Sequence, residues 1–219
     1  MKLLNATAKD IKETLEDDYK KDSGFNEKTL YYGCIQGMKK VQLNKITSQD
    51  IEGPVKTFLI NWGTMRQGLN KKKGWEKKLE KSLKKNCELF STFRSENLLL
   101  YEDIERPEIR EKIEKSYRVI RKHVGPTATS KILHIISPKF FPMWDGAIKD
   151  SISKERKKDN INESPNGYYN FMLTIKSFIS NGKRKNIIIS LSEKCKVSEI
   201  RTVDKYFWLK APRPKKKKK

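Results

Sequence analysis

HVGPTATSKILHIISPKFFPMWDGAIK, residues 123–149, is the stretch of sequence that decides the fold. Its Gly-Pro pair at 125–126 predicts a tight hairpin, because proline pre-sets the first turn of a helix, here over residues 127–136. A loop fixed by Pro138 and Pro142 follows. Asp145 then predicts the N-cap of a helix that runs to about residue 155. The stretch therefore predicts two helix starts joined by an apolar loop.

Most of the remaining chain also has the apolar spacing of three and four that marks one buried face of a helix. Thr47 with Asp50 predicts a capping box, and Pro54 predicts the first turn of the helix that follows. The last helix, about Ser198–Leu209, is expected to bury Trp208. Residues 186–191 contain three consecutive isoleucines and could form a strand, but in a helical chain we favour a helix or an extended connector.

These patterns predict an all-α fold. We expect one helical domain over residues 1–211, divided into two lobes that share a cleft near residues 123–149 and contain a helix-hairpin-helix motif. Residues 212–219, which end in five lysines, are expected to form a disordered basic tail.

The formal net charge of +22 is unevenly distributed along the chain. Residues 1–53 carry nine lysines and nine acidic residues, so all of the excess lies in residues 54–219, with 40 basic and 18 acidic residues. A chain this basic attracts polyanions, most often nucleic acid. The alternative is a solvated lysine-rich surface that binds nothing in particular.

Cysteine and histidine are too few and too scattered for a metal site or a disulfide framework. The three cysteines, Cys34, Cys87 and Cys195, form no CxxC or CxxH pair, and there are two histidines. We expect no metal and no cofactor. No apolar run approaches membrane-spanning length, and the N-terminus lacks a signal-peptide core. We therefore expect a monomer without membrane contact in a reducing intracellular compartment, the cytoplasm or nucleoid, or the nucleus in a eukaryote.

The hairpin has the composition of a phosphate-binding helix start. Val124 can fill the core between the two helices, and Gly125 permits a backbone geometry that a side chain would block. The amides of Thr127, Ala128 and Thr129 should lack intrahelical partners and are therefore the expected phosphate donors. The alternative is a plain helical corner, as found in any all-helical protein.

Asp145 is the candidate catalytic residue, since a carboxylate in apolar surroundings can stabilise a developing oxocarbenium ion or activate water. Phe140, Phe141 and Trp144 beside it could stack on an extruded base or wedge into the duplex. Each has a structural alternative: Asp is an ordinary helix cap, and such aromatic residues more often fix a loop to the core.

The VGPTA hairpin, the apolar helix, the Phe-Pro loop and the helix-capping aspartate together resemble the helix-hairpin-helix DNA glycosylase superfamily. The similarity covers about residues 108–150. The segment also resembles a group of uncharacterised microbial proteins with an SKxLHxxxPxxFPxWD stretch. The resemblance implies a hairpin that holds a DNA phosphate and a catalytic aspartate at Asp145, eighteen residues after Thr127.

Two departures from the family pattern limit the activity that the resemblance implies. Members with lyase activity carry a lysine nucleophile at the position of Thr127, and threonine cannot form the Schiff base. Lys131, one turn further on, is a weak substitute with the wrong register. The iron–sulfur cluster of some branches needs four cysteines, which this chain lacks.

The sequence thus leaves three hypotheses. The first is a monofunctional DNA glycosylase that binds damaged duplex DNA, flips a base and hydrolyses its N-glycosidic bond. The second is a helix-hairpin-helix DNA-binding protein without enzymatic activity. The third, which rests on charge alone, is an RNA- or ribosome-associated basic protein.

Overall fold

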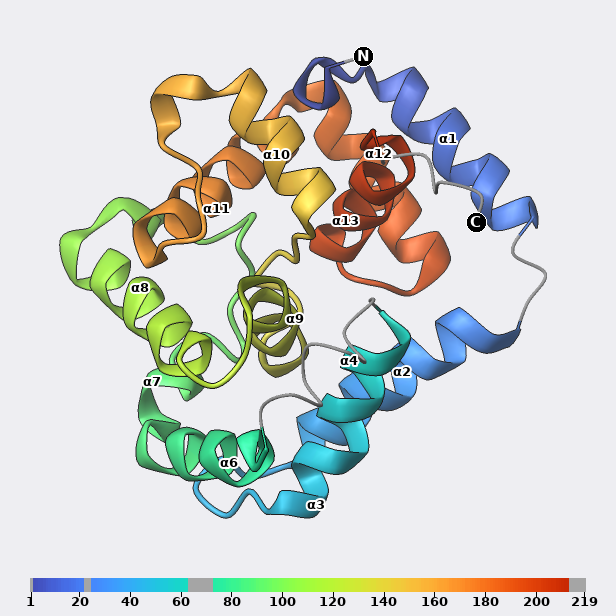
Figure 1. The fold of residues 1–219 in the computed structure, drawn as a ribbon. Helices are drawn as coiled ribbons and strands as arrows, with labels where there is room; N and C mark the ends of the chain where they lie inside the picture. The colour runs from blue at the N-terminus through green and yellow to red at the C-terminus, as the bar shows by residue number, and fades with distance from the viewer. Residues whose placement is uncertain (1, 22–24, 63–72, 213–219) are drawn as a thin grey trace, which may run out of the picture.

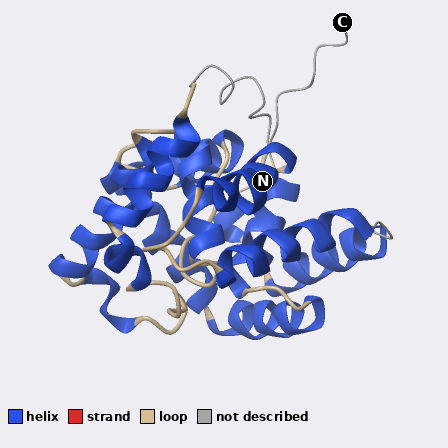
Figure 2. Cartoon of the chain, turned by 90° about the horizontal axis from the view of Figure 1, so that it is seen from below, coloured by secondary structure: helices blue, strands red, loops and turns tan. Residues whose placement is uncertain are grey.

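The computed structural model describes residues 2–21, 25–62 and 73–212, and these residues form helices joined by loops, without a strand (Figure 2). The all-α prediction is therefore confirmed. The expected tail beyond residue 212 lies outside the described residues. The α-helices are α1 (Ala8–Lys21), α2 (Phe25–Lys40), α3 (Ser48–Asp50), α4 (Thr57–Asn61), α6 (Trp75–Lys85), α7 (Cys87–Ser91), α8 (Pro107–Arg121), α9 (Pro126–Ile136), α10 (Gly146–Glu155), α11 (Pro165–Ser180), α12 (Gly182–Cys195) and α13 (Glu199–Lys210). Short helical turns are η1 (Leu3–Asn5), η2 (Ile51–Lys56, a π-helix), η3 (Glu102–Glu105) and η4 (Lys157–Asp159).

Helix α9 lies at the centre of the fold and packs against α2, α4 and α8 (Figure 1). Every residue from Ala128 to Ile136 is buried, including the polar ones. The rest of the chain supplies the surrounding helices, whose apolar faces form one core cluster that extends from Leu3 to Ala211. A central helix buried on all sides explains why the 123–149 stretch is so apolar in an otherwise highly charged chain.

A buried histidine connects α9 to two other parts of the fold. His134 Nδ1 lies 2.8 Å from the carbonyl oxygen of Phe141, and its Nε2 lies 2.8 Å from the hydroxyl of Tyr31 on α2. Since a carbonyl only accepts, Nδ1 carries the proton and Nε2 accepts from Tyr31. Burial lowers the pKa of His134 to about 3, although the Phe141 carbonyl acts in the opposite direction. The ring is therefore a neutral structural link between α2, α9 and the loop before α10.

Three local predictions can be compared with the structure. The capping box is present, since Thr47 N donates to Asp50 Oδ2 at 2.7 Å and Thr47 Oγ1 accepts from Asp50 N. Pro54 does not open a helix as predicted; it lies within η2, where a wide π-helical turn accommodates a residue that has no N–H. The run 186–191 belongs to α12, so the preference for a helix is confirmed.

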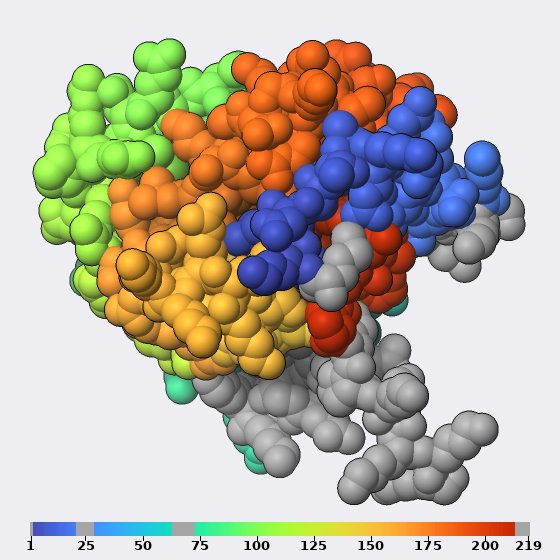
Figure 3. All heavy atoms as spheres, turned by 90° about the horizontal axis from the view of Figure 1, so that it is seen from above, coloured from blue at the N-terminus to red at the C-terminus, as the bar shows by residue number. Residues whose placement is uncertain are grey.

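Residues at the beginning of the chain are held by helices from its second half. Leu4 N donates to Glu155 Oε2 of α10 at 2.9 Å, and Arg184 of α12 donates to the Leu4 carbonyl at 2.9 Å. Asp10 of α1 accepts from Lys210 of α13 at 3.0 Å and also from the Tyr206 hydroxyl. Figure 3 shows this N-terminal segment, in blue, against α10 and α12.

None of the helices in the described ranges combines the length and the apolar character needed to cross a membrane.

Trp208 is 46% exposed, so the prediction that α13 buries it is wrong. Its indole contacts the Lys205 ammonium, 5.2 Å from the ring centroid, at the surface of α13.

Candidate nucleic-acid interface

The predicted hairpin joins α8 to α9 in four residues, 122–125. Helix α8 ends at Arg121, and the amides of His123 and Val124 both donate to the Ile120 carbonyl, at 3.0 and 3.4 Å. Val124 is completely buried, as expected for a residue that fills the space between the two helices. Pro126 occupies the first turn of α9, where its missing N–H costs no hydrogen bond. The sequence therefore predicted the position of this corner correctly.

Gly125 has an ordinary backbone conformation, which corrects the reason we gave for it. It is the N-cap of α9 with φ −78° and ψ 170°, an extended geometry open to any residue. A Cβ atom built on Gly125 would meet nothing within 4 Å. Neither strain nor crowding within the chain therefore requires a glycine here. The space in front of its Cα is open, and a small residue leaves that space available to a ligand.

The donors at the start of α9 are fewer than predicted. Thr129 N donates to the Gly125 carbonyl at 2.9 Å, and the Thr129 hydroxyl donates to the same oxygen at 3.0 Å. The prediction that the Thr129 amide lacks an intrahelical partner is therefore wrong, and Thr129 is also fully buried. The amides of Thr127 and Ala128 precede this first intrahelical hydrogen bond, but Ala128 is fully buried as well, whereas Thr127 is partly exposed. The remaining candidate phosphate donors are the amide and the hydroxyl of Thr127.

Asp145 caps α10 as predicted, with Oδ1 accepting from Ile148 N at 2.9 Å. It is partly exposed, whereas the four residues before it are buried. Hydrogen bonds join this segment to the start of α9. Trp144 Nε1 donates to the Pro126 carbonyl at 3.3 Å, and Trp144 N donates to Ser130 Oγ at 3.2 Å. The structure thus brings together the two features that the sequence singled out, the hairpin and the aspartate.

The aromatic residues proposed to stack on a base are core residues instead. Phe140 stacks on Phe93 with ring centroids 4.5 Å apart, and Phe141 contacts the same ring edge-on. Trp144 packs against three aromatic rings, those of Tyr117, Tyr168 and Phe171. Phe140, Phe141 and Trp144 are each 2% exposed or less, so in this structure no ring is available to a base. The structural alternative, a loop fixed to the core, is what the structure contains.

A buried carboxyl group near Asp145, that of Asp204, was not predicted from the sequence. Asp204 of α13 is 4% exposed, and its Oδ2 accepts from Met143 N at 3.4 Å. Burial raises the pKa of Asp204 well above its usual value, while Arg201, the Met143 amide and Lys131 lower it and the Asp145 charge raises it. Periodicity could have revealed this residue, since Asp204 is four positions after Ile200 and therefore lies on the same helix face.

Lys131, the weak candidate for a nucleophile, is buried close to Asp204. It is 6% exposed, its Nζ donates to the Trp62 carbonyl, and its charge acts on Asp204. The structure places it inside the protein rather than on the surface that carries the hairpin amides.

Lysine side chains lie next to the hairpin on α6. Ser82 of α6 forms a hydrogen bond with His123, Oγ to Nε2, at 2.8 Å. Lys78 and Lys85 flank Ser82 on the helix by four and three positions, and both are exposed. Arg118 and Lys122, near the end of α8, are exposed as well. The hairpin and the lysine-rich helix α6 are therefore neighbours, and exposed basic residues lie on α6 and at the end of α8.

One acidic residue, Glu163, pairs with two basic residues. Glu163 accepts from Lys149 at 3.0 Å and lies 3.9 Å from Arg121. Lys149, near the start of α10, and Arg121, at the end of α8, therefore share a carboxylate partner that partly neutralises their positive charge.

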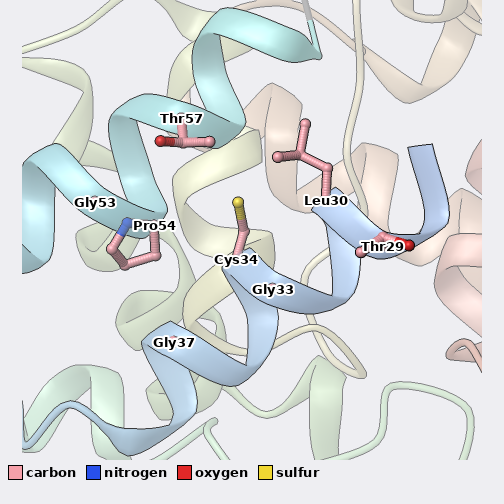
Figure 4. Close-up of a pocket in the computed structure, with 8 residues that line it drawn as sticks. All are labelled: Thr29, Leu30, Gly33, Cys34, Gly37, Gly53, Pro54 and Thr57. Carbon is pink, nitrogen blue, oxygen red and sulfur yellow. The ribbon is translucent and has the colours of Figure 1, made fainter. Parts of the chain in front are cut away.

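The pocket drawn in Figure 4 lies away from Asp145, between α2 and the segment formed by η2 and α4. Its volume is about 420 Å³, and its walls are mostly small or apolar side chains: Thr29, Leu30, Gly33, Cys34, Gly37, Gly53, Pro54 and Thr57. Burial raises the pKa of Cys34 to about 11, so its thiol is protonated at neutral pH. No hairpin residue lines this pocket.

Within the ranges that the structure describes, no three His, Cys, Asp or Glu side chains gather in a way that could hold a metal ion. Comparison of the chain with protein-family models, curated proteins and solved structures gives no match.

Proposed function

We propose that this protein is a DNA-binding protein of the glycosylase type. The start of α9 would take a backbone phosphate of duplex DNA, and Asp145 would face the sugar of a nucleotide flipped out of the stack. The observation that carries the proposal is the link between Trp144 and Pro126, 3.3 Å from Nε1 to the carbonyl oxygen. This link and the Ser130 hydrogen bond make the phosphate donors and the carboxylate parts of one rigid unit.

The proposed chemistry needs one carboxylate and one water. As the bond from the sugar to the base breaks, positive charge develops on the sugar ring, and the Asp145 carboxylate stabilises it. Water then adds to the sugar, and its proton leaves with the base. Threonine at position 127 supplies no amine to attack the sugar, which favours hydrolysis alone.

The proposed contact surface for DNA extends from the hairpin onto α6. Lysines on this surface would neutralise phosphates without reading bases. The hydrogen bond between Ser82 and His123 fixes their distance from the hairpin. We therefore expect affinity that depends steeply on salt and little on sequence.

A second candidate function, DNA binding without catalysis, is favoured by the aromatic residues. Phe140, Phe141 and Trp144 fill the core beside Asp145, and the pocket in Figure 4 is lined by other residues. In this alternative Asp145 is only a helix cap.

A base-release assay separates the two functions. Wild type, Asp145→Asn and the control Asp150→Asn are incubated with duplexes that carry a panel of damaged bases, and DNA affinity is measured in parallel. Asp150 lies on the same helix with its side chain 61% exposed, so its substitution controls for charge on α10. Release by wild type and the control, but not by Asp145→Asn, supports the glycosylase. Binding without release from any duplex supports the second function.

A further inference from the structure

The three residues before Asp145 are each held by a different helix. The Pro142 carbonyl accepts from the Tyr168 hydroxyl of α11 at 2.8 Å, Met143 N donates to Asp204 of α13, and Trp144 N donates to Ser130 of α9. Two of these partners are neutral hydroxyls, which satisfy a buried backbone group at little cost. The third is a carboxyl group, which is costly to bury and which an amide or hydroxyl could replace as an acceptor.

Other charged and polar side chains act on Asp204. Lys131 approaches from α9, Arg201 from its own helix, and Asp145 from the start of α10. The hydroxyls of Tyr31 on α2 and Tyr168 on α11 also lie within its electrostatic reach. The two cationic groups offset part of the cost of burying a carboxyl group at this position.

We propose that Asp204 is a positioning residue for Asp145, because its carboxyl group holds the backbone two residues before Asp145. This inference rests on the proposed function only where it concerns catalysis. The hydrogen bond stands on the fold and can be tested without any substrate.

The first arm of the test measures hydrogen exchange of the Met143 amide by NMR in the full chain. Wild type is compared with Asp204→Ala, with Asp204→Asn and with the control Thr202→Ala. Thr202 is a buried residue of α13 whose hydroxyl donates only to Ser198 O within the described hydrogen bonds, at 3.2 Å. Asp204→Ala should accelerate exchange at Met143 by about tenfold, because the amide loses its acceptor. Asp204→Asn and the control should keep the wild-type rate. An unchanged rate in Asp204→Ala would overturn the positioning role.

The second arm applies if wild type releases a base. Asp204→Ala should then lower the rate of release by about tenfold, and Asp204→Asn, which retains the acceptor oxygen, should restore the wild-type rate. A wild-type rate in Asp204→Ala would show that the hydrogen bond has no role in catalysis. If wild type releases no base while the first arm gives the expected result, the proposed function fails and the positioning role of Asp204 stands.

Discussion

Trp144 and Pro126 are eighteen residues apart in the chain, and the indole nitrogen of one donates to the carbonyl oxygen of the other at 3.3 Å. This hydrogen bond spans the distance between the N-termini of α9 and α10. Both helices therefore begin at the same part of the protein, where one offers the amide and hydroxyl of Thr127 and the other a carboxylate. These two helix starts can act as one site.

Asp145→Asn should lower the rate of base release by about 10²-fold or more, because the amide lacks the negative charge needed opposite the cationic sugar. The amide can still cap α10, so DNA affinity and thermal stability should change little. Single-turnover release and a binding titration on the same duplex measure the two effects. Full release by the variant would remove Asp145 from the chemistry.

Borohydride should trap no covalent adduct between the protein and abasic DNA. Thr127 cannot form a Schiff base, and the Lys131 amine is buried and donates to the Trp62 carbonyl. Gel electrophoresis of the reduced mixture detects an adduct directly. If an adduct appears in wild type and disappears in Lys131→Gln, then Lys131 is a nucleophile and the site opens further than this structure shows.

Gly125→Ala should weaken DNA binding without changing the stability of the folded protein. Open space surrounds the added methyl group, and the backbone angles suit alanine, so the free energy of unfolding should remain within about 0.5 kcal/mol of wild type. If a phosphate binds against Gly125, the methyl group should weaken DNA binding, and Gly125→Glu should weaken it further by repulsion. Thr127→Ala, which removes one donor, should also weaken binding. Unchanged affinity in all three variants would move the phosphate site elsewhere.

Substituting the α6 lysines next to the hairpin should reduce both the affinity for DNA and its dependence on salt. In Lys78→Gln/Lys85→Gln, the slope of log affinity against log salt should fall by about one for each lost phosphate contact. The control is Lys12→Gln/Lys20→Gln, which removes the same charge from exposed positions on α1. Equal effects in both pairs would indicate general attraction by net charge and no defined surface.

Acid should destabilise the protein through His134. Its pKa in the folded protein is about 3 against an ordinary value of 6.5, so between these pH values the unfolded chain binds the extra proton. Stability should therefore fall as pH drops from about 6.5 towards 3, by on the order of 3–5 kcal/mol in full. Urea unfolding at several pH values measures the slope, which should be shallower in His134→Gln.

Asp204 contributes a slope of the opposite sign, because its pKa is raised in the folded protein. The comparison for His134 is therefore best made in an Asp204→Asn background, where this opposing contribution is removed. An identical pH dependence with and without His134 would show that the ring is not held neutral by burial.

Short-range sequence patterns were sufficient to predict many of the helix boundaries in this fold. The capping box at Thr47, Pro126 in the first turn of α9 and Asp145 at the start of α10 each depend on a few neighbouring residues, which the sequence displays together. The helical character of the remaining chain favoured a helix or an extended connector over a strand for residues 186–191, and they lie in α12. These features have short-range causes, and short-range patterns therefore predict them.

The remaining features depend on residues distant in sequence. Phe140 has apolar neighbours in the chain, but its ring is buried by residues distant in sequence, Phe93 and Tyr101 among them. Asp204 is sixty-one residues from its backbone donor Met143, so nothing near it in sequence indicates a shared site with Asp145. The conformation of Gly125 was misjudged because glycine is compatible with both a strained and an ordinary turn.

The hydrogen bonds from Leu4 and Asp10 to Glu155, Arg184 and Lys210 also set the order in which parts of the fold can form. They join residues 151 to 200 positions apart in the chain. During synthesis, α1 therefore emerges long before α13, and it stays an undocked amphipathic segment until α13 has emerged. Docking of α1 is a late step in the folding of these residues, and loss of α13 would remove the partners that hold Asp10.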